Sequence, residues 1–233
     1  MFKKLEEDKE SKDSKELDEK EGDLASMLML SAPEKEMRTI AVFGDISEDM
    51  SKDVVSGLWY LRDNAKIQEP VDPEDPDTEF EEVIQPIEVV ISTNGGSADD
   101  MFAIYDAMRM TRSEVDIETC GLGKVMSAGT LLLAAGTKGK RKIGKHCRVM
   151  IHSVIGGSVG PMHQLDNEMK EVKAIQESYI RAICDETNLT ERKLRSLLKK
   201  KVNIYLTAEE AVEHGFARLS EDPSGRCTSW TTR

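Results

Sequence analysis

A serine and a histidine that lie 25 positions apart are the residues of this sequence best suited to chemistry. Ser127 lies in the segment GKVMSAG, residues 123–129, where a short strand should give way to an apolar helix. His152 ends the run RVMIH, which indicates a buried strand. A hydroxyl at a helix start and an imidazole at a strand end are the parts of an acyl-transfer site. In such a site the imidazole takes the hydroxyl proton and returns it to the leaving amine.

Each residue alone also has a structural interpretation. A serine that precedes an apolar helix is commonly the cap of that helix, and its hydroxyl then accepts from a backbone N–H. The same helix start offers backbone N–H groups and a positive dipole end, which favour an oxyanion. A histidine at the end of an apolar strand is commonly a structural residue with satisfied hydrogen bonds. Taken singly, Ser127 and His152 therefore leave both interpretations open.

Two glycine pairs flank these residues in the sequence. Gly95-Gly96 follows a buried strand, where it forms a tight turn or supplies a second oxyanion donor and an edge for substrate to pair with. Ile155-Gly156-Gly157 follows His152 and would form the opposite edge. Two glycine-flanked edges beside one serine and one histidine favour an acyl-transfer site over chance.

The elements that must position these residues alternate along the chain. Apolar periodicity predicts strands over residues 40–43, 87–92, 115–121 and 147–152. It predicts helices over residues 50–64, 97–111, 128–135 and about 165–185, the last long and amphipathic. Alternating strands and helices predict an α/β domain with a mainly parallel sheet.

The net charge of −12 is concentrated in two segments. Residues 1–23 hold ten acidic and six basic side chains, residues 69–82 hold eight acidic and no basic ones, and the rest balances. No excess positive charge is left to displace counterions, which argues against nucleic-acid binding. Three prolines among the acids predict a surface loop over 69–82, either a tolerated insertion or a surface that selects a partner.

Other classes of protein fit poorly. The apolar runs are too short to span a bilayer, and the signal-like run at residues 24–32 follows an acidic stretch, so a membrane or secreted protein is not expected. The four cysteines are scattered, which favours reduced thiols in a cytosol-like compartment over disulfides or a metal site. The histidines lack metal-ligand spacing, and no phosphate-binding GxxxxGK[ST] motif occurs.

Four ordered motifs give the chain a family resemblance. It resembles the ClpP peptidases, proteolytic chambers served by hexameric ATPases, from about Arg38 to Leu219 with a break at the acidic segment. The motifs are ISTNGG at 91–96, SAG at 127–129, AAGTKGKR at 134–141 with RVMIH at 148–152, and LTAEEAVEHG at 206–215. The resemblance implies the ClpP/crotonase-like spiral of ββα units, an α/β fold with a projecting handle helix.

The resemblance also implies roles by position. Ser127 becomes the nucleophile and His152 the base, with the backbone N–H groups of Gly95 and Ala128 as the oxyanion hole. Substrate-binding positions fall on Gly96, Ser97, Ile155, Gly156 and Gly157. No cofactor and no metal are implied for this subunit, since the ATP belongs to the partner.

Two positions depart from the family pattern. The family's third triad member is an aspartate two residues before the aromatic of the last motif, and here that position is Asn203. An asparagine can orient His152 through its amide oxygen, but it cannot stabilise the imidazolium with a full charge. Slow but real peptidase activity is therefore expected. The adjoining family arginine, which helps to lock two rings together, is replaced by Val202.

The expected organisation follows the family. Residues 1–23 form a charged leader, disordered or a propeptide; 24–37 form an axial segment; 38–222 form the peptidase domain, with a handle at about 156–187; and 223–233 form a C-terminal tail. The expected partners are copies of the chain in a heptamer, stacked as a tetradecamer, and a hexameric AAA+ Clp ATPase. Unfolded polypeptides or short peptides are the expected substrates, in a cytoplasmic or equivalent organellar compartment.

Two alternatives stay open. Asn203 also suits a ClpR-like structural subunit that builds mixed rings with a second ClpP-like subunit and cuts weakly or not at all. The acidic leader and loop are compatible with a phage-type maturation protease that acts on one dedicated substrate.

Overall fold

The computed structural model describes residues 37–72, 74–75, 78–200 and 202–220. Beyond Met37 these residues belong to one compact unit, Arg38–Arg233. The expectations for the leader at 1–23, for nearly all of the axial segment at 24–37 and for the tail at 223–233 fall outside the described residues.

A seven-stranded sheet forms the centre of the unit. Its strands are β1 (Thr39–Ile46), β4 (Ile87–Gly96), β5 (Ile117–Met126), β6 (Arg141–Ile143), β7 (Arg148–Ile151), β8 (Ile204–Leu206) and β9 (Arg218–Leu219). The main path runs β1-β4-β5-β6-β9, and every pair along it is parallel. Strand β7 pairs parallel with β5 and antiparallel with β8. The predicted α/β class with a mainly parallel sheet is confirmed.

Strand β5 has two different neighbours on the same side. Its residues 119–121 pair with β6, and its residues 124–126 pair with β7. Gly123 lies between the two halves with a φ of +64°, a conformation that side-chain-bearing residues rarely adopt. The change of neighbour brings β7, and with it β8, to the carboxyl end of β5.

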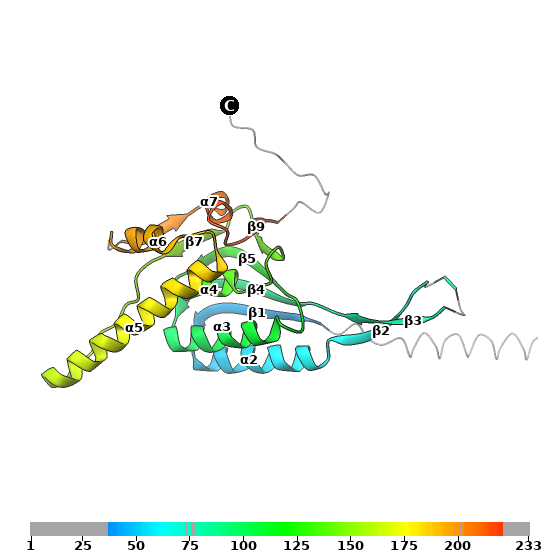
Figure 1. The fold of residues 1–233 in the computed structure, drawn as a ribbon, viewed down its shortest axis with the longest axis horizontal. Coiled ribbons are helices and arrows are strands. Elements are labelled where there is room, and N and C mark those ends of the chain that lie inside the picture. The colour runs from blue at the N-terminus through cyan, green and yellow to red at the C-terminus, as the bar shows by residue number, and fades with distance from the viewer. Residues whose placement is uncertain (1–36, 73, 76–77, 201, 221–233) are drawn as a thin grey trace, which may run out of the picture. The chain divides into compact units, whose positions relative to one another are not determined.

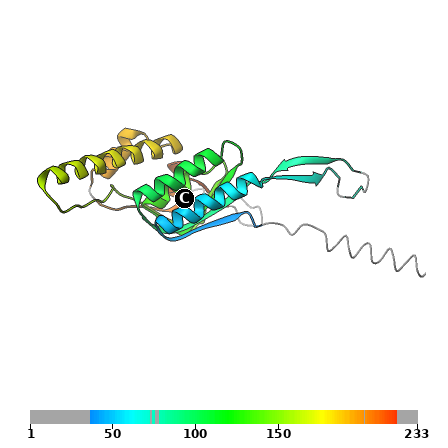
Figure 2. The same cartoon turned by 90° about the horizontal axis from the view of Figure 1, so that it is seen from below.

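Six helices complete the described part of the unit: α2 (Glu48–Asp63), α3 (Ala98–Thr111), α4 (Ala128–Ala134), α5 (Met162–Glu186), α6 (Glu191–Leu198) and α7 (Ala208–Glu213). Figures 1 and 2 show α2 and α3 side by side along the sheet, and α3 also contacts α4. Ser47, Ser97, Thr190 and Thr207 cap α2, α3, α6 and α7 through their side chains. Each hydroxyl accepts from the backbone N–H of the third helical residue.

The core lies between the sheet and these helices. Val89 and Ile91 of β4 are fully buried, as the continuous apolar run of the strand predicts for a sheet covered on this face. Every residue of α4 is buried, including three consecutive leucines with no exposed surface. Helix α4 is therefore held by packing on all sides, which fixes the residue that precedes it.

Helix α5 is buried only near its C-terminus. Its buried residues begin at Tyr179, and the preceding turns project away from the sheet (Figure 1). At the buried end, the Glu186 carboxylate binds Arg112 at 2.7 Å and Arg141 at 3.3 Å. Burial alone would raise the pKa of Glu186, but the hydrogen bond and charge of Arg112 and the charge of Arg141 hold it below its usual value.

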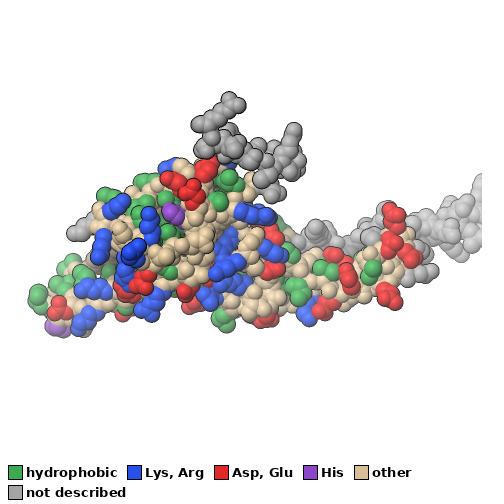
Figure 3. All heavy atoms as spheres, turned by 45° about the horizontal axis from the view of Figure 1, so that its top comes forward, with side chains coloured by type: hydrophobic (Ala, Val, Ile, Leu, Met, Phe, Trp, Pro, Cys, Tyr) green, Lys and Arg blue, Asp and Glu red, His purple; other side chains and the backbone are tan. Residues whose placement is uncertain are grey.

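The acidic segment corrects one prediction. A surface loop was expected over 69–82, but the structure pairs the two ends of that segment in an antiparallel hairpin of β2 (Lys66–Pro70) and β3 (Phe80–Ile84), and only the connection between the strands is a loop. Pro70 is the last residue of β2, opposite Phe80, and an edge strand tolerates a proline at such a position. Acidic side chains gather on this hairpin, which extends from the body (Figure 3).

Other boundaries differ by a few residues. Strand β4 continues through Gly95 and Gly96, where a turn was predicted, because both residues pair with β1. Strand β7 ends at Ile151, so His152 is the first residue after it. Helices α6 and α7 and strands β6, β8 and β9 were not predicted as elements. Within the described ranges, the helices are too short or too polar to cross a membrane.

Candidate active site

Ser127 occupies a sharp turn between β5 and α4. Its φ of +54° and ψ of −122° make it the only residue other than glycine with positive φ in the described part of the chain. Such a conformation costs on the order of 1–3 kcal/mol and persists only where the surroundings impose it. The Ser127 N–H donates to the Met150 carbonyl at 2.8 Å, and the Thr130 N–H donates to the Ser127 carbonyl at 3.0 Å. The strain therefore lies at the residue that the sequence singles out.

The Ser127 hydroxyl does not cap α4. Although Ser127 occupies the cap position, its side chain makes no capping bond. Its Oγ lies 2.6 Å from His152 Nε2. The structural interpretation of Ser127 as a helix cap therefore does not hold, and the hydroxyl is directed at the imidazole.

Strand register explains why the two residues meet. Met126 pairs with Met150 in the parallel β5–β7 ladder, so Ser127 and His152 follow adjacent strand ends at the same edge of the sheet. Carboxyl ends of parallel strands are where α/β proteins commonly place reactive groups. The 25-residue separation in sequence thus becomes direct contact in space.

The environment of His152 suits a base. Burial lowers the pKa of His152 from its ordinary value of 6.5, so the imidazole is neutral at neutral pH. A neutral ring that carries its proton on Nδ1 presents a lone pair on Nε2 to the Ser127 hydroxyl. That tautomer allows proton transfer from Oγ to Nε2.

Asn203 lies beside His152 without contacting it through a hydrogen bond. Ile151 pairs with Ile204 in the antiparallel β7–β8 ladder, so one further step of this register places Asn203 opposite His152. Asn203 lines the same pocket as Ser127 and His152, but its side chain is exposed. No hydrogen bond joins Asn203 to His152 among the residues that the structure describes.

The two expected oxyanion donors differ in availability. Ala128 is the first residue of α4, so its N–H has no acceptor within the helix and remains free to bind an oxyanion. The Gly95 N–H instead donates to Thr93 Oγ1 at 2.9 Å. Stabilisation of an oxyanion by Gly95 would require this bond to be exchanged or shared.

Gly95 and Gly96 allow a close approach of backbones. A Cβ on Gly95 would lie 2.5 Å from the Ser127 Cβ, and the φ of Gly95 is +102°. A Cβ on Gly96 would lie 2.1 Å from the carbonyl oxygen of Ile46. Side chains at either position would therefore displace the nucleophile or β1.

A cavity of about 450 Å³ contains the serine and the histidine. Its wall includes the predicted positions Gly96, Ser97 and Ile155. The hydroxyl of Ser97 accepts from the Asp100 N–H and caps α3, so its established contact is structural. The apolar part of the wall is formed by Met101, Ala128, Met150, Val154 and Tyr179.

The glycines of the second edge lie outside this cavity wall. Gly156 and Gly157 are exposed and follow Ile155, itself 82% exposed. A Cβ on Gly156 would lie 2.6 Å from Val172 of α5, whereas Gly157 is open. The glycine at 156 thus lets this segment run close against the projecting helix.

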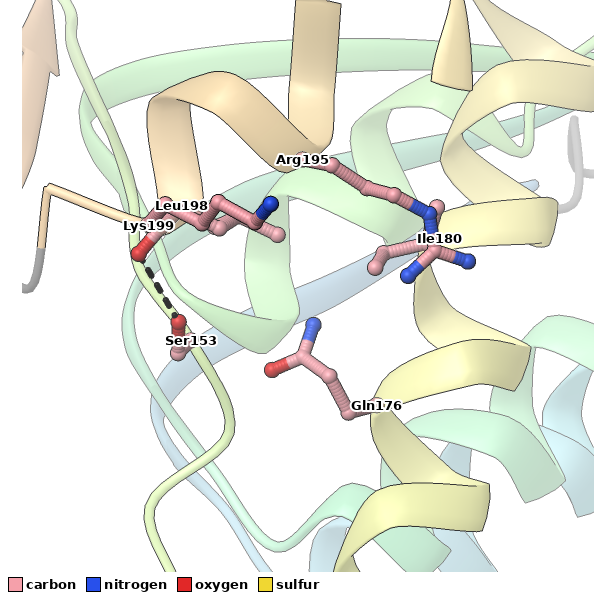
Figure 4. A pocket seen from close by; sticks show the side chains of 6 residues that line it. All are labelled: Ser153, Gln176, Ile180, Arg195, Leu198 and Lys199. Carbon is pink, nitrogen blue, oxygen red and sulfur yellow. Dashed lines mark hydrogen bonds between the residues drawn. The ribbon is translucent and has the colours of Figure 1, made fainter. Parts of the chain in front are cut away.

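The segment after His152 is anchored by α5 and α6, and Figure 4 shows Ser153 with Gln176 of α5 and Leu198 of α6 nearby. The Ser153 hydroxyl donates to the Leu198 carbonyl of α6 at 3.3 Å. The Val154 N–H donates to Gln176 Oε1 of α5 at 2.7 Å. Two helices therefore fix the position of the chain immediately beyond the imidazole.

Sequence reasoning missed four residues that support the site. They are Thr93, Thr130, Gln176 and Tyr179. Thr130 carries the only polar side chain in α4, and this isolation was a signal that could have been read. Tyr179 was counted only as an apolar position of the long helix. Thr93 and Gln176 have no signal in a single sequence, because their partners come from folding.

A serine–histidine pair at the carboxyl edge of a mostly parallel α/β sheet is one arrangement that serine hydrolases use. Residues 78–219 match the family model described as Clp protease, which covers more than half of the 233 residues. The chain belongs to the Clp protease family. The match begins at residue 78, inside the acidic segment of residues 69–82.

Proposed function

We propose that this protein is a serine endopeptidase that cleaves polypeptides through an acyl-enzyme on Ser127. The observation that carries the proposal is the 2.6 Å contact between Ser127 Oγ and His152 Nε2 at a strained turn. Membership of the Clp protease family supports a ClpP-like peptidase.

The reaction follows from the geometry. His152 Nε2 removes the Oγ proton as Ser127 attacks the scissile carbonyl, and the Ala128 N–H faces the oxygen that gains charge. The imidazolium then returns the proton to the leaving amine, and the ester on Ser127 remains. Water, deprotonated by His152, hydrolyses this ester and regenerates the hydroxyl. Asn203 is proposed to orient His152 once substrate is bound.

A fluorophosphonate probe tests the nucleophile directly. The probe should label the protein at Ser127, and Ser127→Ala should abolish both labelling and turnover of a short fluorogenic peptide. Ser113→Ala is the matched control, because Ser113 is exposed and its hydroxyl bonds only to Met110 within α3. Equal turnover in the wild type and Ser127→Ala would refute the proposed function.

The proposed assembly is a ring of seven copies, with a second ring stacked on it. Large apolar side chains are exposed on or next to the projecting part of α5, including Val159, Met162 and Met169. Such a patch suits a protein interface. Val202 stands where the family has the arginine that helps to lock two rings together, so the contact between stacked rings should be weaker. A single heptamer or a mixed ring is then the expected alternative to the stacked pair. Native mass spectrometry distinguishes these states, and a monomer at micromolar concentration would contradict the chamber.

The proposed partner is a hexameric AAA+ Clp ATPase, which would unfold polypeptides and feed them to the chamber. Without it, short peptides are the expected substrates. The described cysteines Cys120, Cys147 and Cys184 are free thiols, which fits the proposed cytoplasmic location. Degradation of an unfolded protein only when ATPase and ATP are added would support this pairing.

A second function is favoured by one observation. Asn203 is exposed, and among the described residues it makes no hydrogen bond to His152. The imidazole of His152 therefore lacks an orienting partner. A ClpR-like subunit that builds mixed rings without cutting would show this arrangement. Absence of fluorophosphonate labelling in an assembled, folded ring would favour the structural subunit over the peptidase.

A further inference from the structure

A chain of buried hydrogen bonds connects α5 to the strained serine. The Thr130 hydroxyl donates to the Ser127 carbonyl at 2.7 Å, and Thr130 Oγ1 lies 2.8 Å from the Tyr179 hydroxyl. Thr130 has no exposed surface, and Tyr179 is 4% exposed. The chain therefore runs through the interior from the base of the projecting helix to the backbone of Ser127.

The direction of each hydrogen bond from Tyr179 through Thr130 to Ser127 follows from counting the available protons. Thr130 has one hydroxyl proton, and the Ser127 carbonyl can only accept, so that proton lies between them. The Tyr179 hydroxyl must then donate to Thr130 Oγ1. Burial raises the pKa of Tyr179 to about 12, so this donor keeps its proton at any working pH.

The other capped helices show what Ser127 would otherwise do. The caps Ser47, Ser97, Thr190 and Thr207 all have negative φ, and each hydroxyl accepts from the N–H of the third helical residue. In α4 the third residue is Thr130. Its N–H donates to the Ser127 carbonyl instead, and its hydroxyl donates to the same oxygen. Thr130 thus holds the Ser127 peptide in the turned conformation with two bonds.

We propose that Tyr179 and Thr130 are positioning residues that keep Ser127 out of the ordinary helix-cap conformation and its hydroxyl directed at His152. The role rests on the proposed peptidase function, but the conformation of Ser127 can be observed without activity. Without the two hydroxyls, the Ser127 backbone can rotate to negative φ. Its Oγ can then accept from the N–H of residue 130, as in an ordinary helix cap. The nucleophile would then be lost while the fold is kept.

Hydroxyl deletions test the proposal. Tyr179→Phe and Thr130→Val should each lower the rate of fluorophosphonate labelling at Ser127, and kcat for a short peptide, by roughly tenfold with KM little changed. Thr130→Ser keeps the hydroxyl and should retain most of the rate that Thr130→Val loses. Tyr105→Phe is the matched control, because it removes a buried tyrosine hydroxyl that bonds to Glu186 instead. Its labelling rate should equal that of the wild type.

A crystal structure of Thr130→Val supplies the second measurement. Negative φ at Ser127, with Oγ bonded to the N–H of residue 130, supports the proposal whether or not the wild type proves active. Unchanged positive φ in Thr130→Val overturns it, as does wild-type labelling in both deletions. A wild type that is never labelled refutes the peptidase function, and the φ of Ser127 in the variant then decides the positioning role alone.

Discussion

Substitution of Asn203 by aspartate should raise peptidase activity. The register of β7 and β8 places this position opposite His152, and residues directly opposite in antiparallel strands have Cβ atoms about 4.5–5.5 Å apart. A carboxylate there can accept from Nδ1–H of His152, fix the tautomer and stabilise the imidazolium that forms when Ser127 loses its proton. The amide of Asn203 supplies at most the first two effects.

The size of the gain follows from Coulomb's law. Unit charges about 4 Å apart interact by about 1 kcal/mol in water and about 4 kcal/mol at an effective dielectric constant of about 20. Because position 203 is exposed, solvent screens the charge, and the expected interaction energy lies toward the lower of these two values. We expect about 1–2 kcal/mol of extra transition-state stabilisation, a rise of about 5- to 30-fold in kcat/KM.

The pH profile gives an independent readout. Burial lowers the pKa of His152 below 6.5, so the acid limb of the wild-type kcat/KM profile should have its midpoint below pH 6.5. A neighbouring carboxylate favours the charged imidazole and raises its pKa. The acid limb of Asn203→Asp should therefore move to higher pH, while the plateau at alkaline pH rises.

Peptide turnover across pH 5–9 measures both effects. Val202→Asp is the matched control, because it adds the same charge at the adjacent exposed position, one residue before the position that the β7–β8 register places opposite His152. That variant should show neither the higher plateau nor the shifted limb. If Asn203→Asp behaves like Val202→Asp, position 203 does not face His152 and the reasoning from register is refuted.

Two further substitutions test the packing around the site. Gly95→Ala should abolish fluorophosphonate labelling, since its Cβ would lie 2.5 Å from that of Ser127; Gly139→Ala, also at positive φ but with open space around it, should label normally. Glu186→Gln should lower the free energy of unfolding by about 3–5 kcal/mol in urea titration, because it leaves buried arginine charges uncompensated. Glu177→Gln, at a half-exposed ion pair with Arg195, should barely move the urea midpoint, and equal midpoints for the two glutamate variants would contradict the expected cost of the buried charges.

The sequence predicted the fold class and the longer strands and helices of the body because their signals are local. The apolar runs of β4 and β7 and the periodicity of α3 and α5 can be read within one segment. The hairpin was missed because its strands are short and stabilised by each other across an acidic turn. Strand β8 was missed for the same reason, since three residues gain strand geometry only from β7.

The candidate site shows the same division. Ser127 and His152 could be picked out by residue type and neighbourhood, and the motifs related them to a family. The availability of each oxyanion donor could not be predicted, because the Gly95 N–H meets Thr93 only through a side-chain rotamer set by packing. The positive φ of Ser127 was equally hidden, since a serine before a helix is ordinarily a cap with negative φ.

The departure at Asn203 is coupled to the hydrogen bonds that support Ser127. An aspartate would fix His152, and the pair would then hold the Ser127 hydroxyl by attraction to a well-oriented base. With asparagine, exposed and unbonded to His152 in the structure, that restraint is weaker. The nucleophile must then be held from its own backbone, and the bonds from Thr130 and Tyr179 do this from the interior. The two substitutions should therefore be non-additive: the rate lost on Tyr179→Phe should be smaller in the Asn203→Asp background than in the wild type, as a double-mutant cycle on kcat would measure.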